Sequence, residues 1–156
     1  MTNSKILHVR SATTWTSGVA SVSTIRNFAP IIMDEPTSLG GQDTGANPLE
    51  YLTAALNGCK AVMIPLIAQE LKFEFTALRF ETHGTIDLRG LYGVAGISSH
   101  FQTLSFIVYI ETDESEQRLN QLKNLVATRC PIYNLIKDAG VKIETVWHRQ
   151  AIAAVV

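Results

Sequence analysis

The sequence carries little charge, and the charge it has is balanced. Its 156 residues include 13 Lys and Arg against 14 Asp and Glu, which gives a formal net charge of -1. No basic run occurs, so the chain lacks the cationic face that phosphates require, and we expect no nucleic acid partner. Charged residues make up 17% of the chain and hydrophobic residues 46%. So few charges leave much apolar surface on a monomer of this size, which predicts a buried subunit interface.

Long apolar runs are missing too. No stretch approaches the roughly 18 uninterrupted apolar residues that are typical of a membrane-spanning helix. The first residues, MTNSKILHVRS, lack the apolar centre of a signal peptide. We therefore expect a cytoplasmic protein with no membrane partner.

Several catalytic and ligand-binding motifs are absent. No zinc pattern occurs, and no serine has the flanking glycines of a hydrolase elbow. Residues 34–47 (DEPTSLGGQDTGAN) resemble a phosphate-binding loop in composition, but they lack the Lys-Ser/Thr ending of a nucleotide site. We expect neither a bound metal nor a bound cofactor. The histidines are scattered without ligand spacing, at His8, His83, His100 and His148.

Cysteine is scarce, since only Cys59 and Cys130 are present. Two cysteines in such a chain are more typical of free, catalytic or redox-cycling thiols than of a permanent structural bridge. Considered separately, each cysteine could equally be a small hydrophobic residue of the core, without a chemical role. The functional interpretation therefore requires that the two thiols meet.

The longest helical pattern covers residues 47–71 and contains Cys59 near its middle. Asn47 is a suitable N-cap, Pro48 suits the first helical position, and Glu50 can complete a capping box. Pro65 removes one backbone hydrogen bond, so we expect a kink or break there. The three-and-four spacing of apolar residues predicts an inward face that includes Leu49, Leu52, Leu56, Cys59, Val62, Met63, Leu66 and Ile67.

The rest of the chain predicts an α+β protein with one domain over residues 1–156. Strand patterns come first, then the loop and long helix, then more strands, paired helices and a last strand. The expected strands are 6–15, 19–26, 28–33, 74–87, 101–110 and 141–147, and the expected later helices are 114–129 and 132–138.

The two cysteines occupy different predicted environments. Cys130 precedes Pro131 at the start of a short helix, where free amides and the helix dipole favour a thiolate. Cys59 lies on an apolar helix face, where burial raises the thiol pKa, so it needs a nearby cation to become a nucleophile.

Arg26, at the end of a predicted strand, is our candidate for that cation, although a solvated strand arginine explains it as well. Glu50 could orient Arg26 through a bidentate pair, or it could be a helix cap only. Glu50 and Cys59 are nine positions apart on the predicted helix, which places them on opposite faces and about 13 Å apart along its axis. If Glu50 serves the Cys59 site, a second subunit is therefore expected to supply it.

Four segments together resemble the OsmC/Ohr family, the osmotically induced and organic hydroperoxide resistance proteins. They are DEPTSLGGQDTGANPLEYLTAALNGC (34–59), GTIDLRG (84–90), HFQTL (100–104) and RCPIYNLI (129–136). The resemblance implies an OsmC-like α+β fold, with two antiparallel β-sheet regions around a long central helix in an intertwined homodimer. It also implies thiol-dependent reduction of organic hydroperoxides.

By motif, the resemblance makes Cys59 the attacking cysteine and Cys130 the resolving cysteine. Arg26 would stabilise the thiolate and Glu50 would hold the arginine. A Cys59–Cys130 disulfide would then be reduced by an external dithiol or lipoyl-type reductant, with no bound cofactor.

A second interpretation remains open. In the family's peroxidases the glutamate directly follows the helix-opening proline, whereas here Leu49 fills that place and Glu50 comes one position later. This shift favours a non-enzymatic dimeric module that binds an apolar ligand or senses redox state.

Overall fold

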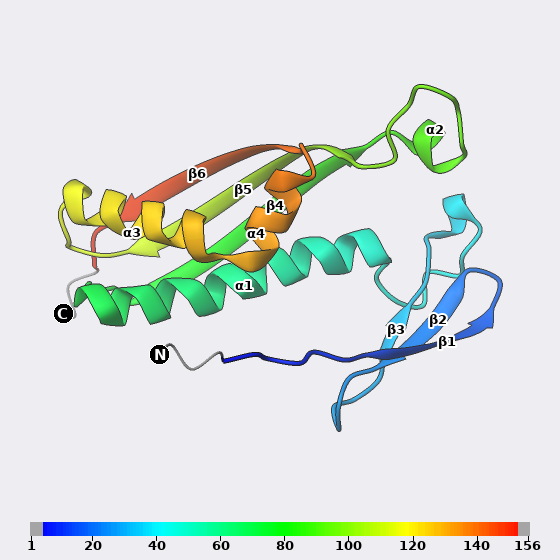
Figure 1. The fold of residues 1–156 in the computed structure, drawn as a ribbon, viewed down its shortest axis with the longest axis horizontal. Helices are drawn as coiled ribbons and strands as arrows, with labels where there is room; N and C mark the ends of the chain where they lie inside the picture. Colours follow the sequence, from blue (N-terminus) through cyan, green and yellow to red (C-terminus); the bar gives the residue numbers. More distant parts are fainter. Residues whose placement is uncertain (1–4, 153–156) are drawn as a thin grey trace. The chain divides into compact units, whose positions relative to one another are not determined.

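A computed structural model describes residues 5–152 of the chain (Figure 1). The chain forms two compact units, the first ending at Leu52 and the second beginning at Thr53. The long helix α1 (Pro48–Leu71) starts in the first unit and continues through the second. The mixed α+β class predicted from the sequence is confirmed.

The first unit is built on a three-stranded antiparallel sheet in the order β1-β2-β3. Its strands are β1 (Ala12–Ser17), β2 (Ala20–Thr24) and β3 (Ile31–Met33). Gly18 lies in the β1–β2 turn with φ +54°, a conformation that glycine adopts without steric cost. Most strand boundaries differ from the prediction: β1 begins at Ala12 and runs to Ser17, and β3 begins only at Ile31. β2 ends at Thr24, before Arg26, which occupies a turn.

The loop after β3 is organised by one buried carboxylate. Asp34 is 2% exposed and accepts hydrogen bonds from the backbone amides of Glu35, Gln42 and Thr44 and from the Thr44 hydroxyl, at 2.9–3.2 Å. These bonds, the Thr44 amide foremost, lower the pKa of Asp34. A Cβ at Gly41 would collide with the Glu35 carbonyl. The glycine-rich composition thus serves tight packing around a carboxylate.

The capping box predicted for α1 is confirmed. The Glu50 amide donates to the Asn47 side chain at 2.9 Å, and the Asn47 amide donates to the Glu50 carboxylate at 2.8 Å. Of the kink or break predicted at Pro65, the break is wrong, because the helix runs through Pro65 to Leu71. Although α1 is apolar and long enough to cross a membrane, it contributes buried residues to a protein core, as core helices do.

The inward face of α1 differs in part from the prediction. Leu56 and Ile67 are buried as expected, whereas Val62 is 65% exposed and Leu66 is 45% exposed. The helix is apolar on almost every side, so the spacing alone did not identify the packed face. The buried residues are Leu56, Lys60, Ile64, Ile67 and Ala68.

The second unit contains a sheet in the order β4-β5-β6. Its strands are β4 (Ala77–Ile86), β5 (Phe101–Glu111) and β6 (Lys142–Gln150). β4 and β5 are antiparallel, but β5 and β6 are parallel, so this sheet is mixed and not purely antiparallel as predicted. A parallel pair needs a crossover, which α3 (Glu116–Arg129) and α4 (Pro131–Asp138) supply.

Alternation along β5 shows which face of this sheet is packed. Leu104, Phe106, Val108 and Ile110 are at most 2% exposed, while the residues between them are half-buried. The buried side chains form one core with residues of α1, α3 and α4, and Figure 1 shows β5 between β4 and β6. A single helical turn that the sequence pattern missed, α2 (Leu88–Leu91), follows β4.

Candidate dithiol site

The structure brings the two cysteines of the sequence together. The sulfur atoms of Cys59 and Cys130, 71 positions apart in the chain, lie 2.8 Å from each other and are not bonded. A disulfide bond is about 2.05 Å long, so less than an ångström of movement would close it. Cys59 comes from α1, and Cys130 joins the end of α3 to the start of α4.

The two cysteine residues differ in exposure. Cys130 is 0% exposed, whereas Cys59 is half-buried. A Cβ built on Gly58 would meet nothing within 4 Å, so the chain next to Cys59 leaves open space. Of the two cysteines, Cys59 is therefore the one more open to an external reagent.

The prediction that the helix start favours a Cys130 thiolate is wrong in its net effect. Cys130 is the N-cap of α4 and Pro131 follows it, as expected. Burial is the largest influence and raises the pKa of the Cys130 thiol, and the hydrogen bond with Cys59 raises it further. The Tyr133 amide and the Lys60 charge act in the opposite direction but do not prevail. The helix start therefore acts on Cys130 in the predicted direction, but burial outweighs it.

The cation beside the pair is one that sequence reasoning missed. Lys60 directly follows Cys59 and is only 2% exposed. Its Nζ lies 4.0 Å from the centre of the Tyr133 ring and 5.7 Å from that of Phe106. Burial lowers the pKa of Lys60, while negative charge on Cys130 and on Cys59 opposes that effect. Lys60 lies four positions after Leu56 and four before Ile64, and this spacing is the feature of the sequence that places it on the buried face of α1.

A polar contact fixes α1 to the sheet near Cys59. The Thr82 hydroxyl on β4 donates to the Asn57 side-chain oxygen at 2.6 Å. Asn57 is two residues before Cys59, so this bond holds α1 to β4 close to the thiol. No group of three or more His, Cys, Asp or Glu side chains within residues 5–152 is arranged to hold a metal ion.

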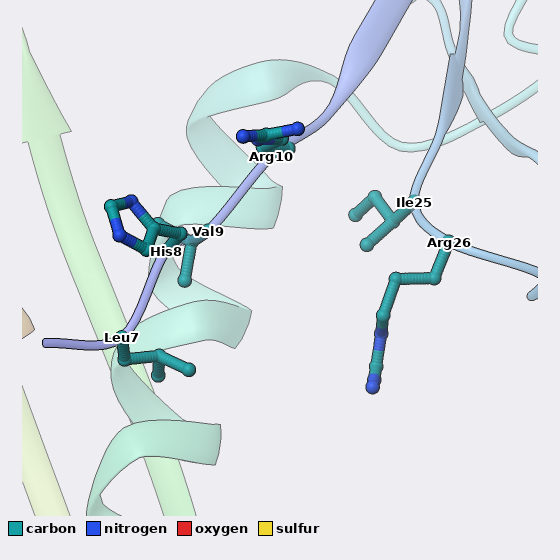
Figure 2. A pocket seen from close by; sticks show the side chains of 6 residues that line it. All are labelled: Leu7, His8, Val9, Arg10, Ile25 and Arg26. Atoms are coloured by element: carbon teal, nitrogen blue, oxygen red, sulfur yellow. The ribbon is translucent and has the colours of Figure 1, made fainter.

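Arg26 and Glu50 both belong to the first unit. Arg26 is exposed in its turn with φ 50°, and its guanidinium lies 4.5 Å from the centre of the Phe28 ring. It lines an open hollow of about 720 Å³ with Arg10 and His8 (Figure 2). Glu50 is exposed and forms the capping box of α1. Their roles toward Cys59 stay predictions.

Comparison with known proteins identifies a family. The sequence profile of a family described as OsmC-like protein matches residues 41–146. No curated protein matches the chain in sequence.

Solved structures share the fold at low sequence identity. An OsmC-like protein from Mycoplasma pneumoniae has a TM-score of 0.76 and 16% identity, over 94% of this chain and 99% of that one. An organic hydroperoxide resistance protein from Elizabethkingia anophelis has a TM-score of 0.75 and 14% identity, over 94% and 99%. A third, the organic hydroperoxide resistance protein OsmC from Legionella pneumophila, has a TM-score of 0.70 and 16% identity, over 92% and 98%.

Proposed function

Because the chain belongs to the OsmC-like protein family, we propose that it is a cytoplasmic, thiol-dependent peroxidase that reduces organic hydroperoxides. The observation that carries this proposal is the 2.8 Å separation of the Cys59 and Cys130 sulfurs. Two free thiols at this distance can cycle between a dithiol and a disulfide with little movement of the backbone. The names of the solved relatives, which include organic hydroperoxide resistance proteins, support the choice of substrate.

The oxidative half of the cycle begins at the accessible thiol. The Cys59 thiolate attacks the terminal oxygen of the hydroperoxide, the O–O bond breaks, and the released alkoxide takes up a proton to leave as an alcohol. Cys59 becomes a sulfenic acid. The Cys130 sulfur then displaces hydroxide from the Cys59 sulfur, and the thiol proton leaves with that hydroxide as water.

The reductive half needs a partner from outside the chain. A dithiol or lipoyl-type reductant supplies two electrons and two protons and opens the Cys59–Cys130 bridge by thiol exchange. No bound cofactor or metal takes part.

Apolar side chains near Cys59 favour an organic substrate over hydrogen peroxide. Val62 and Leu66, three and seven positions after Cys59 on α1, are 65% and 45% exposed. Each methylene group buried against such a surface contributes about 0.8 kcal/mol.

Other exposed hydrophobic residues support a homodimer in which a second subunit supplies Arg26 and Glu50 to Cys59. Large hydrophobic side chains are also exposed in the first unit, including Trp15 at 69% and Phe28 at 63%. A stable subunit interface would cover them. Sedimentation equilibrium should return twice the chain mass of 17.1 kDa, and a particle of the single-chain mass at micromolar concentration would contradict the dimer.

Turnover tests the proposed activity. Purified protein should consume cumene hydroperoxide in the presence of dithiothreitol, and the Cys59→Ser variant should lose the activity by more than about a hundredfold, because the attacking sulfur is gone. Consumption that does not exceed that of Cys59→Ser would remove the peroxidase proposal.

The alternative is a non-enzymatic dimeric module that binds an apolar ligand or senses redox state. The one-residue shift of Glu50 favours this alternative, because its carboxylate accepts a hydrogen bond from the Asn47 amide in the capping box. Such a protein would bind an apolar probe without consuming peroxide.

A further inference from the structure

Lys60 is a charged residue in an environment that ordinarily excludes charge. It is 2% exposed and lies on the packed face of α1 between Leu56 and Ile64. A buried ammonium without compensation costs several kcal/mol, so lysine is rarely found in such a place without a partner.

The groups that face Lys60 identify its partner. No carboxylate within residues 5–152 forms an ion pair with it. Its ammonium contacts the Tyr133 ring in the first turn of α4, where Cys130 is the N-cap. The titratable groups that interact with it are the thiols of Cys130 and Cys59, and Phe106 on β5 adds a second aromatic ring. Within one chain, the anionic partners that the described residues offer Lys60 are therefore the thiolates of these two cysteines.

Access to the sulfurs decides which thiolate requires that partner. An external thiolate attacks the disulfide at Cys59, since Cys130 is 0% exposed. The new bond joins the external sulfur to Cys59, the Cys59–Cys130 bond breaks, and Cys130 leaves as a thiolate. That anion forms in a buried position, where desolvation disfavours it.

We propose that Lys60 is a positioning residue for the reductive half of the cycle, with its buried ammonium stabilising the Cys130 thiolate as it leaves. The proposal rests on the dithiol cycle proposed above and adds a role that neither cysteine can fill. The second thiol of the reductant then attacks its own sulfur in the mixed disulfide and releases Cys59, and two protons complete the dithiol.

The experiment follows reduction alone, so it does not depend on peroxide turnover. Protein oxidised by diamide is mixed with dithiothreitol, and thiols are counted after acid quenching at intervals, at several pH values between about 6 and 9. An opposite charge close to an ionisable group shifts its pKa by about 1 to 3 units, and a thiol of lower pKa is the better leaving group in thiol–disulfide exchange. We expect Lys60→Met to slow reduction at pH 7 by about tenfold.

Matched variants separate charge from shape. Lys60→Arg keeps the charge and should remain within about threefold of the wild-type rate, while Lys137→Met removes an exposed lysine of α4 and should leave the rate unchanged. If Lys60→Met does not fold, Lys60→Gln takes its place.

Two results would overturn the proposal. One is a neutral variant at position 60 that is reduced as fast as the wild type, and the other is a Lys60→Arg rate as low as that of Lys60→Met. A slow Lys60→Met together with no peroxide consumption by the wild type would reject the peroxidase proposal and keep the role of Lys60.

Discussion

Replacing Cys130 by serine should reduce steady-state peroxide turnover by more than about a hundredfold while leaving the first oxidation of Cys59 intact. Cys59 is the accessible sulfur, so the variant should still react once with an organic hydroperoxide. Without a second thiol 2.8 Å away, the Cys59 sulfenic acid should persist. Dimedone labelling followed by peptide mass mapping measures this directly, and steady-state assays with dithiothreitol measure the loss of turnover.

The wild type is the control for this experiment, because its sulfenic acid should be consumed by Cys130 before dimedone reacts. Strong dimedone labelling of both proteins would mean that Cys130 does not resolve the sulfenic acid. Absence of labelling in Cys130→Ser would mean that Cys59 does not attack the peroxide.

Truncating Leu122 to alanine should lower the free energy of unfolding by about 3 kcal/mol. Leu122 lies on α3, is 0% exposed, and belongs to the core that α3 shares with β5 and α1. Its loss removes buried apolar surface and leaves a cavity. Urea unfolding followed by circular dichroism measures the difference.

Leu135→Ala is the matched control, since Leu135 is 69% exposed on α4. The same substitution there should change the unfolding free energy by no more than about 0.5 kcal/mol. Equal losses at positions 122 and 135 would show that the described packing of α3 is incorrect.

Much of the fold could be predicted from local signals that act through the backbone. The sequence Asn47-Pro48-Leu49-Glu50 defines the start of α1 because both side chains of the capping box bond to nearby amides. The β-branched and aromatic residues of 101–110 likewise predict the strand β5. Neither inference depends on residues distant in the sequence.

The pKa of the Cys130 thiol and the direction of the β5–β6 pairing could not be predicted from local signals. Residue spacing places Cys130 at a helix start, but the pKa of its thiol depends on burial in the folded chain, which outweighs the helix amides and raises it. The parallel pairing of β5 with β6 also depends on how the chain crosses over between them. Such outcomes depend on distant packing.

Residues with unusual environments were the hardest to identify. Charge within a helical pattern is usually solvated, so the spacing of Lys60 from Leu56 and Ile64 does not by itself predict that Lys60 is 2% exposed. Arg26 was assigned to a strand, yet its φ of 50° places it in a turn where a left-handed conformation is required. Both residues contradict the typical behaviour of their types.

Counting the thiols of the wild-type protein after substoichiometric organic hydroperoxide tests the dithiol cycle most directly. Each peroxide consumed should remove two thiols from one chain, with the peptides of Cys59 and Cys130 joined by a disulfide in the mass map. Peroxide that leaves every thiol titratable, or that removes Cys59 alone and leaves Cys130 free, would contradict the cycle.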